Sequence, residues 1–127
     1  MARSVLEDPV ALTSMLVAID SVNPSLVPGA AGETAIVARL APLLREAGFE
    51  VQLLETVPGR PSIVAWSRGQ GDGRTLMLNG HLDTVGVGRM EHPFEPRIES
   101  GRLHGRGALD MKAGVAAMIA AVVRARK

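Results

Sequence analysis

The stretch RTLMLNGHLDTV, Arg74 to Val85, decides how the fold of this sequence is interpreted. Its first part, RTLMLNGH, is an apolar run that predicts a β-strand. Its second part places two ionisable groups, His81 and Asp83, two residues apart directly behind that run. Ligands gather at the carboxyl ends of strands in α/β sheets. The stretch therefore predicts an α/β fold with a candidate site at His81.

Helical patterns lie on both sides of this stretch. Apolar residues at helical spacing predict helices over 7–22, 33–48 and 111–127. Asp8 can cap the first helix, with Pro9 at its first position. An interior proline disturbs a helix, so Pro42 predicts a bend in the second one. Gly48 suits the end of that helix.

Extended segments fill the space between the helices. Strands are predicted over 49–57 and 61–67, and the glycine-rich turn RGQGDG predicts that the second of them pairs antiparallel with RTLMLNGH. Another hairpin is predicted within 94–107, turning at Glu99–Arg102. These elements indicate an α/β fold in which a layered mixed β-sheet is flanked by helices.

Composition narrows the classes of protein to consider. The 127 residues are 46% hydrophobic and 21% charged, which is typical of one globular domain. A net charge of +1 with interspersed signs indicates neither a nucleic-acid nor a membrane partner. The absence of cysteine excludes disulfides and thiolate zinc sites. The N-terminal stretch does not resemble a signal peptide, so a cytoplasmic location is expected by default.

His81 and Asp83 support two interpretations. In an extended segment, residues two apart point to the same side, so Asp83 can accept a hydrogen bond from one imidazole nitrogen of His81. The other nitrogen is then free to bind a metal. Alternatively, the pair is a turn residue beside a solvated carboxylate.

Asp110, in GRGALDMKAG, also supports two interpretations. It can be the N-cap of the last helix, or a carboxylate kept ionised there as a metal ligand must be. The flanking Gly105 and Gly107 indicate a tight turn or a close approach of the backbone. The other two histidines, His92 and His104, are interpreted as surface or packing residues. The sequence contains no phosphate-binding glycine motif and no serine-nucleophile motif.

The two segments become specific in combination. LNGHLDTV followed by PFEPRIESGRLHGRGALDMKAG resembles the zinc-dependent deacylase and peptidase family. That family includes acetylornithine deacetylase, succinyl-diaminopimelate desuccinylase, aminoacylase and the glutamate carboxypeptidases. The resemblance extends to SVNPSLVPGAAGE and to the segment from Arg60 to His81, and so covers nearly the whole chain. The SVNPS loop is most similar to the deacetylase and desuccinylase branch.

The resemblance implies a zinc-peptidase-like catalytic domain that hydrolyses the amide bond of N-acyl amino acids or small peptides. His81 would bind one zinc ion, Asp83 would orient His81 for catalysis, and Asp110 would bridge two zinc ions, with cobalt as a possible substitute. In that family the peptide after the bridging aspartate is commonly cis. We therefore expect a cis Asp110–Met111 bond, with the Asp110 side chain facing His81.

The resemblance also implies that residues 1–127 are the N-terminal portion of such a catalytic domain. The family's general base and further ligands follow the bridging aspartate, but the 17 residues after Asp110 include no Asp, Glu or His. The lid and dimerisation domain is absent too, although a homodimer is possible for a full-length parent. We expect this chain alone to be inactive.

Two alternatives belong to other classes. The chain can be a non-catalytic truncated remnant or binding module, and a Glu-Glu pair encoded in frame after Lys127 would instead indicate a truncated enzyme. A nucleotide-binding α/β domain fits the fold class but lacks every phosphate signature.

Overall fold

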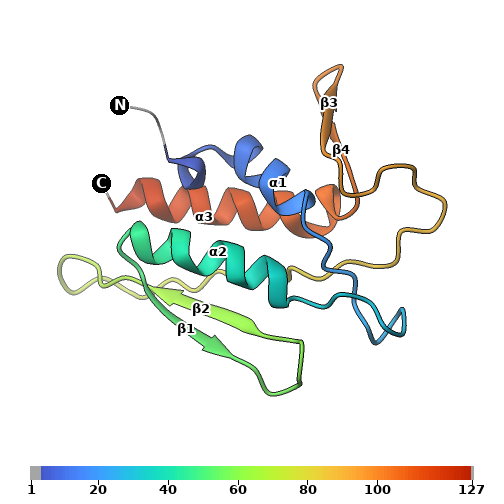
Figure 1. Cartoon of the computed structure of the whole chain (residues 1–127). Coiled ribbons are helices and arrows are strands. Elements are labelled where there is room, and N and C mark those ends of the chain that lie inside the picture. Colours follow the sequence, from blue (N-terminus) through green and yellow to red (C-terminus); the bar gives the residue numbers. More distant parts are fainter. Residues whose placement is uncertain (1–3, 127) are drawn as a thin grey trace.

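The computed structural model describes residues 4–126. Figure 1 shows their helices and two small hairpins. In chain order the elements are η1 (Val5–Glu7), α1 (Pro9–Val17), α2 (Thr34–Glu46), β1 (Glu50–Leu54), β2 (Ser62–Trp66), β3 (Arg97–Glu99), β4 (Arg102–His104), η2 (Ala108–Lys112) and α3 (Ala113–Ala125).

Helices α2 and α3 lie within the predicted ranges 33–48 and 111–127, of which residue 127 is outside the described part of the chain. Helix α1 ends at Val17, so the predicted continuation to residue 22 is wrong. The Asp8 carboxylate accepts hydrogen bonds from the backbone N–H groups of Val10 and Ala11, at 2.9 and 3.1 Å, and Pro9 opens α1. Gly48 follows α2 with a φ of 85°, which glycine adopts readily. The α2 helix continues through Pro42, so the proline does not interrupt it.

The core is built mainly by apolar residues of the helices. Helix α1 packs against α3, and α2 lies against the β1–β2 hairpin. Half-buried Val51 and Ile63 of that hairpin pack against the cluster. Its buried members are Leu6, Leu12, Leu16, Ile36, Val37, Leu40, Leu44, Phe49, Val115, Ala116 and Val123. Within residues 4–126, no helix has the length and apolar character needed to cross a membrane.

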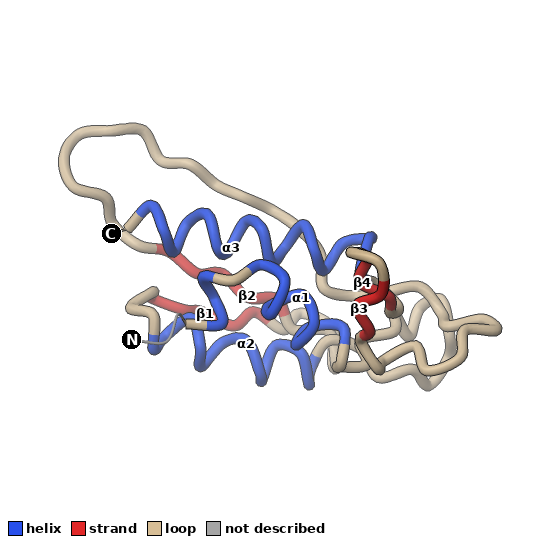
Figure 2. Tube along the Cα trace, turned by 90° about the horizontal axis from the view of Figure 1, so that it is seen from above, coloured by secondary structure: helices blue, strands red, loops and turns tan. Residues whose placement is uncertain are grey.

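The predicted strand RTLMLNGH and its pairing are wrong. Strand β2 pairs antiparallel with β1, in a register that aligns Val51 with Ala65, and the segment 74–81 is not in a strand. Figure 2 shows the chain after β2 as a long loop. A strand needs a hydrogen-bonded neighbour, and no strand in the described part of the chain pairs with this segment. Leu76 and Met77 are accordingly 79% and 81% exposed.

The described residues contain two separate two-stranded antiparallel sheets, and the wider layered mixed sheet stays a prediction. The second sheet confirms the predicted hairpin, because β3 and β4 pair with Glu99 opposite Arg102. Ser100 and Gly101 at its turn both have positive φ, 50° and 74°. Such angles are characteristic of tight hairpin turns.

Candidate metal site

His81 lies between the two aspartates that the sequence singled out. Its Nδ1 is 3.0 Å from the Asp83 carbonyl oxygen and 3.2 Å from Asp83 Oδ1. Its Nε2 is 3.1 Å from Asp110 Oδ1. Nδ1–H can donate to Asp83, and Nε2 can either donate its own proton to Asp110 or, once that proton leaves, offer its lone pair to a metal on the same side. The expected proximity of the three side chains is confirmed.

The loop after α1 holds the segment that carries His81 and Asp83. Val22 and Thr84 form a short parallel bridge. Around it, the N–H of Asn23 donates to the Thr84 carbonyl at 2.9 Å, and the N–H of Thr84 donates to the Ser21 carbonyl at 3.0 Å. The Ser21 hydroxyl donates to the Leu82 carbonyl at 2.7 Å. These bonds place His81 although its own segment is not in a sheet.

Gly80 lets this segment approach the start of α3. A Cβ at Gly80 would lie 2.8 Å from Met118 Cε, 3.1 Å from Met111 Cε and 3.1 Å from Val115 Cγ2. These side chains fill the space that a larger residue at position 80 would need. With glycine there, the backbone can pack closely against α3, and His81 lies within reach of Asp110.

Asp110 lies in the turn η2 rather than capping α3. Its backbone angles, φ −118° and ψ 98°, are not helical, and Lys112 occupies the N-cap position without a side-chain capping bond. The peptide bond between Asp110 and Met111 is cis. The expected cis bond and the expected orientation toward His81 are both confirmed, and the N-cap interpretation of Asp110 is wrong.

Lys112 anchors this turn to α1. Its ammonium group donates to the carbonyl oxygens of Leu16 and Ile19, both at 2.9 Å, and the residue is fully buried. Burial lowers the pKa of Lys112 to about 8, although the nearby negative charge of Asp20 opposes the shift. Its backbone N–H also donates to the Gly107 carbonyl at 2.9 Å. The sequence analysis did not single out Lys112, because lysine is rarely buried.

Sequence analysis also missed the residues behind Asp83. Asn23 Nδ2 donates to Asp83 Oδ2 at 2.8 Å, and Arg60 Nη1 donates to Asn23 Oδ1 at 3.1 Å. Arg60 in turn forms a two-pronged ion pair with Glu33. Asn23 lies in the SVNPS loop that carries part of the family resemblance, which is the one signal that could have pointed to it.

The two carboxylates change the protonation of His81. Burial by itself lowers the pKa of His81, but the hydrogen bonds to the Asp83 carbonyl and to Asp110, with the negative charges of both aspartates, raise it above its usual value. A proton therefore competes with any metal for Nε2 over a wider pH range than at an isolated histidine.

The donor set fits a zinc or cobalt ion in part. Two ligands bound at about 2.0–2.1 Å to a tetrahedral zinc lie about 3.3 Å apart, close to the observed separation of His81 Nε2 and Asp110 Oδ1. Imidazole and carboxylate are ordinary zinc ligands. Among residues 4–126, no group of three or more metal-ligating side chains is assembled. A stable zinc site needs three or four protein ligands, and the described residues bring together one imidazole and one carboxylate that could serve as ligands.

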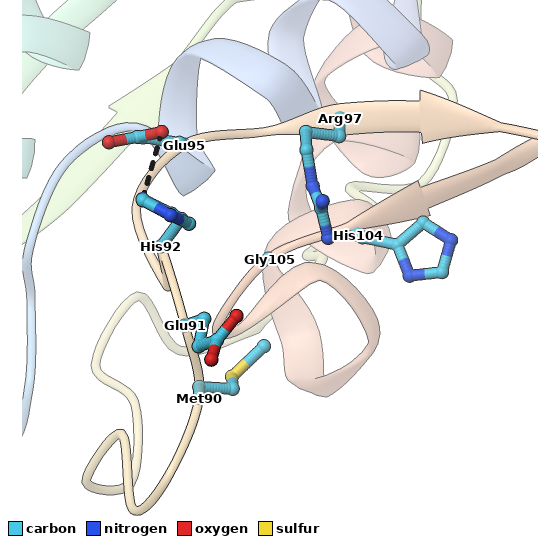
Figure 3. A pocket seen from close by; sticks show the side chains of 7 residues that line it. All are labelled: Met90, Glu91, His92, Glu95, Arg97, His104 and Gly105. Atoms are coloured by element: carbon cyan, nitrogen blue, oxygen red, sulfur yellow. Dashed lines mark ion pairs between the residues drawn. The ribbon is translucent and has the colours of Figure 1, made fainter.

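The remaining histidines line a separate surface pocket, shown in Figure 3. His92 and His104 are both exposed, as expected of surface residues. His92 Nδ1 lies 3.2 Å from Glu95 Oε2, while the His104 ring points away from this pair. The pocket has a volume of about 320 Å³ and is also lined by Met90, Glu91, Arg97 and Gly105.

Comparison with known proteins supports the same family. Residues 77–127, which include His81, Asp83 and Asp110, match Peptidase family M20/M25/M40. This segment includes the end of the RTLMLNGH stretch, the β3–β4 hairpin, η2 and α3.

Relatives align with most of the chain. Succinyl-diaminopimelate desuccinylases from Leptothrix cholodnii and Cereibacter sphaeroides are each 43% identical, over 87% and 91% of this chain. The same enzyme from Wolbachia pipientis is 36% identical over 91%. The aligned region is 29%, 30% and 28% of these relatives, so the chain spans less than a third of their length. The resemblance to the zinc-dependent deacylase and peptidase family is therefore confirmed.

Proposed function

We propose that this chain carries one part of the metal centre of a hydrolase that cleaves the amide bond of N-acyl amino acids or small peptides. The observation that carries the proposal is the 3.1 Å separation of His81 Nε2 and Asp110 Oδ1, with Asp83 on the opposite side of the imidazole. This is the arrangement of a histidine ligand oriented by a carboxylate.

Each of the three residues has a separate role. Asp83 accepts a hydrogen bond from Nδ1–H, which fixes the tautomer of His81 and leaves the Nε2 lone pair for a metal on the side of Asp110. His81 and Asp110 would hold zinc, with Asp110 as the carboxylate shared between two ions. Bound zinc would supply Lewis acidity and a water that ionises near neutral pH.

The names of the relatives favour an N-succinyl amino acid as the substrate. We propose that residues 1–127 form the N-terminal portion of the catalytic domain of such an enzyme, which acts in the cytoplasm and forms a homodimer when complete. The general base and the remaining ligands would come from residues beyond those of this chain.

Calorimetric titration with zinc tests the site. Wild-type chain should bind zinc weakly, and His81→Gln and Asp110→Asn should each abolish the binding heat because each removes one of two ligands. His92→Gln, which changes an exposed histidine outside the site, is the matched control and should bind like wild type. Zinc binding that survives both His81→Gln and Asp110→Asn would refute the proposed site.

A further inference from the structure

A chain of polar side chains leads from Asp83 away from the metal-facing side of His81. Asp83 Oδ2 accepts from Asn23 Nδ2 at 2.8 Å, and Asn23 Oδ1 accepts from Arg60 Nη1 at 3.1 Å. Arg60 also donates through Nε and Nη2 to the two oxygens of Glu33, at 2.5 and 2.7 Å. Three residues from other parts of the sequence, Asn23, Glu33 and Arg60, thus meet behind Asp83.

Backbone contacts hold these segments together independently of the side chains. The N–H of Glu33 donates to the Gly59 carbonyl at 3.2 Å, and the N–H of Gly32 donates to the Val22 carbonyl at 3.0 Å. Gly32 and Gly59 are so close that a Cβ on Gly32 would collide with the Gly59 carbonyl oxygen. The polar side chains therefore start from a fixed framework.

The side chains themselves are largely removed from solvent. The Glu33, Arg60 and Asp83 side chains are 11%, 23% and 23% exposed. A two-pronged guanidinium–carboxylate pair is among the more directional ion pairs in proteins. Glu33 therefore fixes the plane and the position of the Arg60 guanidinium.

The identities of the donors and acceptors fix the direction of each hydrogen bond among Arg60, Asn23 and Asp83. Arginine can only donate, so the side of the Asn23 amide that faces Arg60 must be its oxygen. The same oxygen accepts from the Ser25 backbone N–H at 2.8 Å. The Asn23 NH₂ group is then forced toward Asp83 Oδ2, which leaves Asp83 Oδ1 for His81.

We propose that Arg60 is a positioning residue for the His81 imidazole, acting through Asn23 and Asp83. It sets the orientation of the Asn23 amide, and its Nη2 also lies 3.9 Å from Asp83 Oδ2. The amide holds the Asp83 carboxylate, which shares Nδ1–H of His81 with the Asp83 backbone carbonyl. The consequence for metal binding rests on the proposed function, but the effect on His81 itself does not.

The metal-free chain provides the test. Long-range ¹H–¹⁵N correlation spectra report which ring nitrogen carries the proton, and His81→Gln identifies the signals of His81 among three histidines. Spectra are compared at one pH above the His81 pKa and in an Asp110→Ala background, which removes the acceptor that faces Nε2 in the metal-free chain. The variants are Arg60→Met and Asn23→Asp, with Asp83→Asn as reference. Arg97→Met is the matched control, because Arg97 is 54% exposed and pairs only loosely with Glu99 at 3.6 Å.

With Asp110 removed and no further change, His81 should carry its proton mainly on Nδ1, because both remaining acceptors belong to Asp83. Arg60→Met and Asn23→Asp should shift it toward the mixture seen in Asp83→Asn, while Arg97→Met should match wild type. Zinc affinity should fall about two- to tenfold in Arg60→Met, the equivalent of one lost hydrogen bond. Asp83→Asn should lower it about 10–100-fold.

Asn23→Asp protects the test against loss of fold. It keeps an oxygen for Ser25 and Arg60 and replaces the donor to Asp83 with a carboxylate oxygen that repels Asp83 Oδ2. It therefore decides the question if Arg60→Met unfolds. The proposal is overturned if the His81 signals in Asn23→Asp and in folded Arg60→Met match wild type, or if Asp83→Asn leaves them unchanged. Absence of any zinc binding would refute the proposed function alone, because the spectra need no metal.

Discussion

At the scale of single residues, the contacts of His81 have two opposite effects on metal binding. Two aspartates within 3.2 Å orient the ring, and the same contacts raise its pKa. A fixed orientation of the His81 ring favours metal binding. A raised pKa of His81 opposes it, because the proton on Nε2 must leave before a metal can bind there. Protonation and metal binding at His81 should therefore be linked.

The first prediction is that zinc affinity falls with pH below the pKa of His81. Because one proton is displaced, the affinity should drop about tenfold per pH unit there and level off above that pKa. Calorimetry at pH values on both sides of neutrality measures this. The control is His92→Gln, which changes an exposed histidine outside the site and should follow the wild-type curve. An affinity that does not change with pH would contradict the linkage.

The second prediction concerns the buried ammonium of Lys112. Its pKa of about 8 lies below the ordinary 10.5, so between these values the unfolded chain binds more protons than the folded chain. The free energy of unfolding should therefore rise with pH across this window, by on the order of 1–3 kcal/mol relative to Lys112→Met. Urea denaturation of both proteins near pH 7.5 and 9.5 measures the difference. A constant difference between the two proteins would show that Lys112 keeps its ordinary pKa.

At the scale of elements, the turn before α3 depends on space that only glycine leaves. Gly107 has a φ of 81°, and a Cβ there would lie 2.5 Å from Thr84 Cγ2. The same turn carries Asp110, and Thr84 belongs to the bridge beside Asp83. Packing at Gly107 thus connects the two halves of the site.

The third prediction compares two glycines with the same backbone angle. Gly29 also has a φ of 81°, but a Cβ there would have no atom within 4 Å. Gly29→Ala should cost about 1–2 kcal/mol for the left-handed backbone alone, and Gly107→Ala should cost more because it adds the collision with Thr84. Urea denaturation of the two variants measures the difference. Equal losses would mean that Thr84 moves aside freely.

At the scale of the whole molecule, one extended segment has apolar residues but no strand partner. Leu76 and Met77 are mostly exposed, and the backbone of residues 74–80 is outside the described sheets. Unpaired extended chain with apolar side chains commonly recruits another chain.

The fourth prediction is that the 127-residue chain self-associates through this segment. Leu76→Glu combined with Met77→Glu should reduce the association, because charge on an exposed edge opposes pairing. Leu109→Glu is the matched control, since Leu109 is 93% exposed but lies in η2. Sedimentation velocity measures the species. A sharp monomer peak for the wild-type chain at high concentration would contradict the prediction.

The fifth prediction is that this chain alone does not hydrolyse N-acetylornithine or N-succinyl-diaminopimelate, with or without zinc or cobalt. The proposed site has two candidate ligands and an orienting carboxylate, and among residues 4–126 no third candidate ligand joins them. Assays of product amine at high protein concentration measure this. Turnover that disappears in Asp110→Ala would show that the chain is catalytically sufficient.

Local chemistry made much of the molecule predictable from sequence. The Asp8 cap, the helix-ending Gly48 and the turn at Ser100 and Gly101 follow from the preferences of those residues for particular backbone angles and hydrogen bonds. The family resemblance correctly placed Asp110 beside His81 and its cis bond. The roles of these residues in metal binding stay predictions.

Only the tertiary structure decided the partners of each segment. The apolar run RTLMLNGH predicts a strand, but a strand exists only where another backbone satisfies its hydrogen bonds, and β2 pairs with β1 instead. Lys112 and Arg60 have side chains that sequence patterns assign to the surface. Their contacts are with the carbonyl groups of Leu16 and Ile19 and with the Glu33 and Asn23 side chains, which chain folding brings from distant positions.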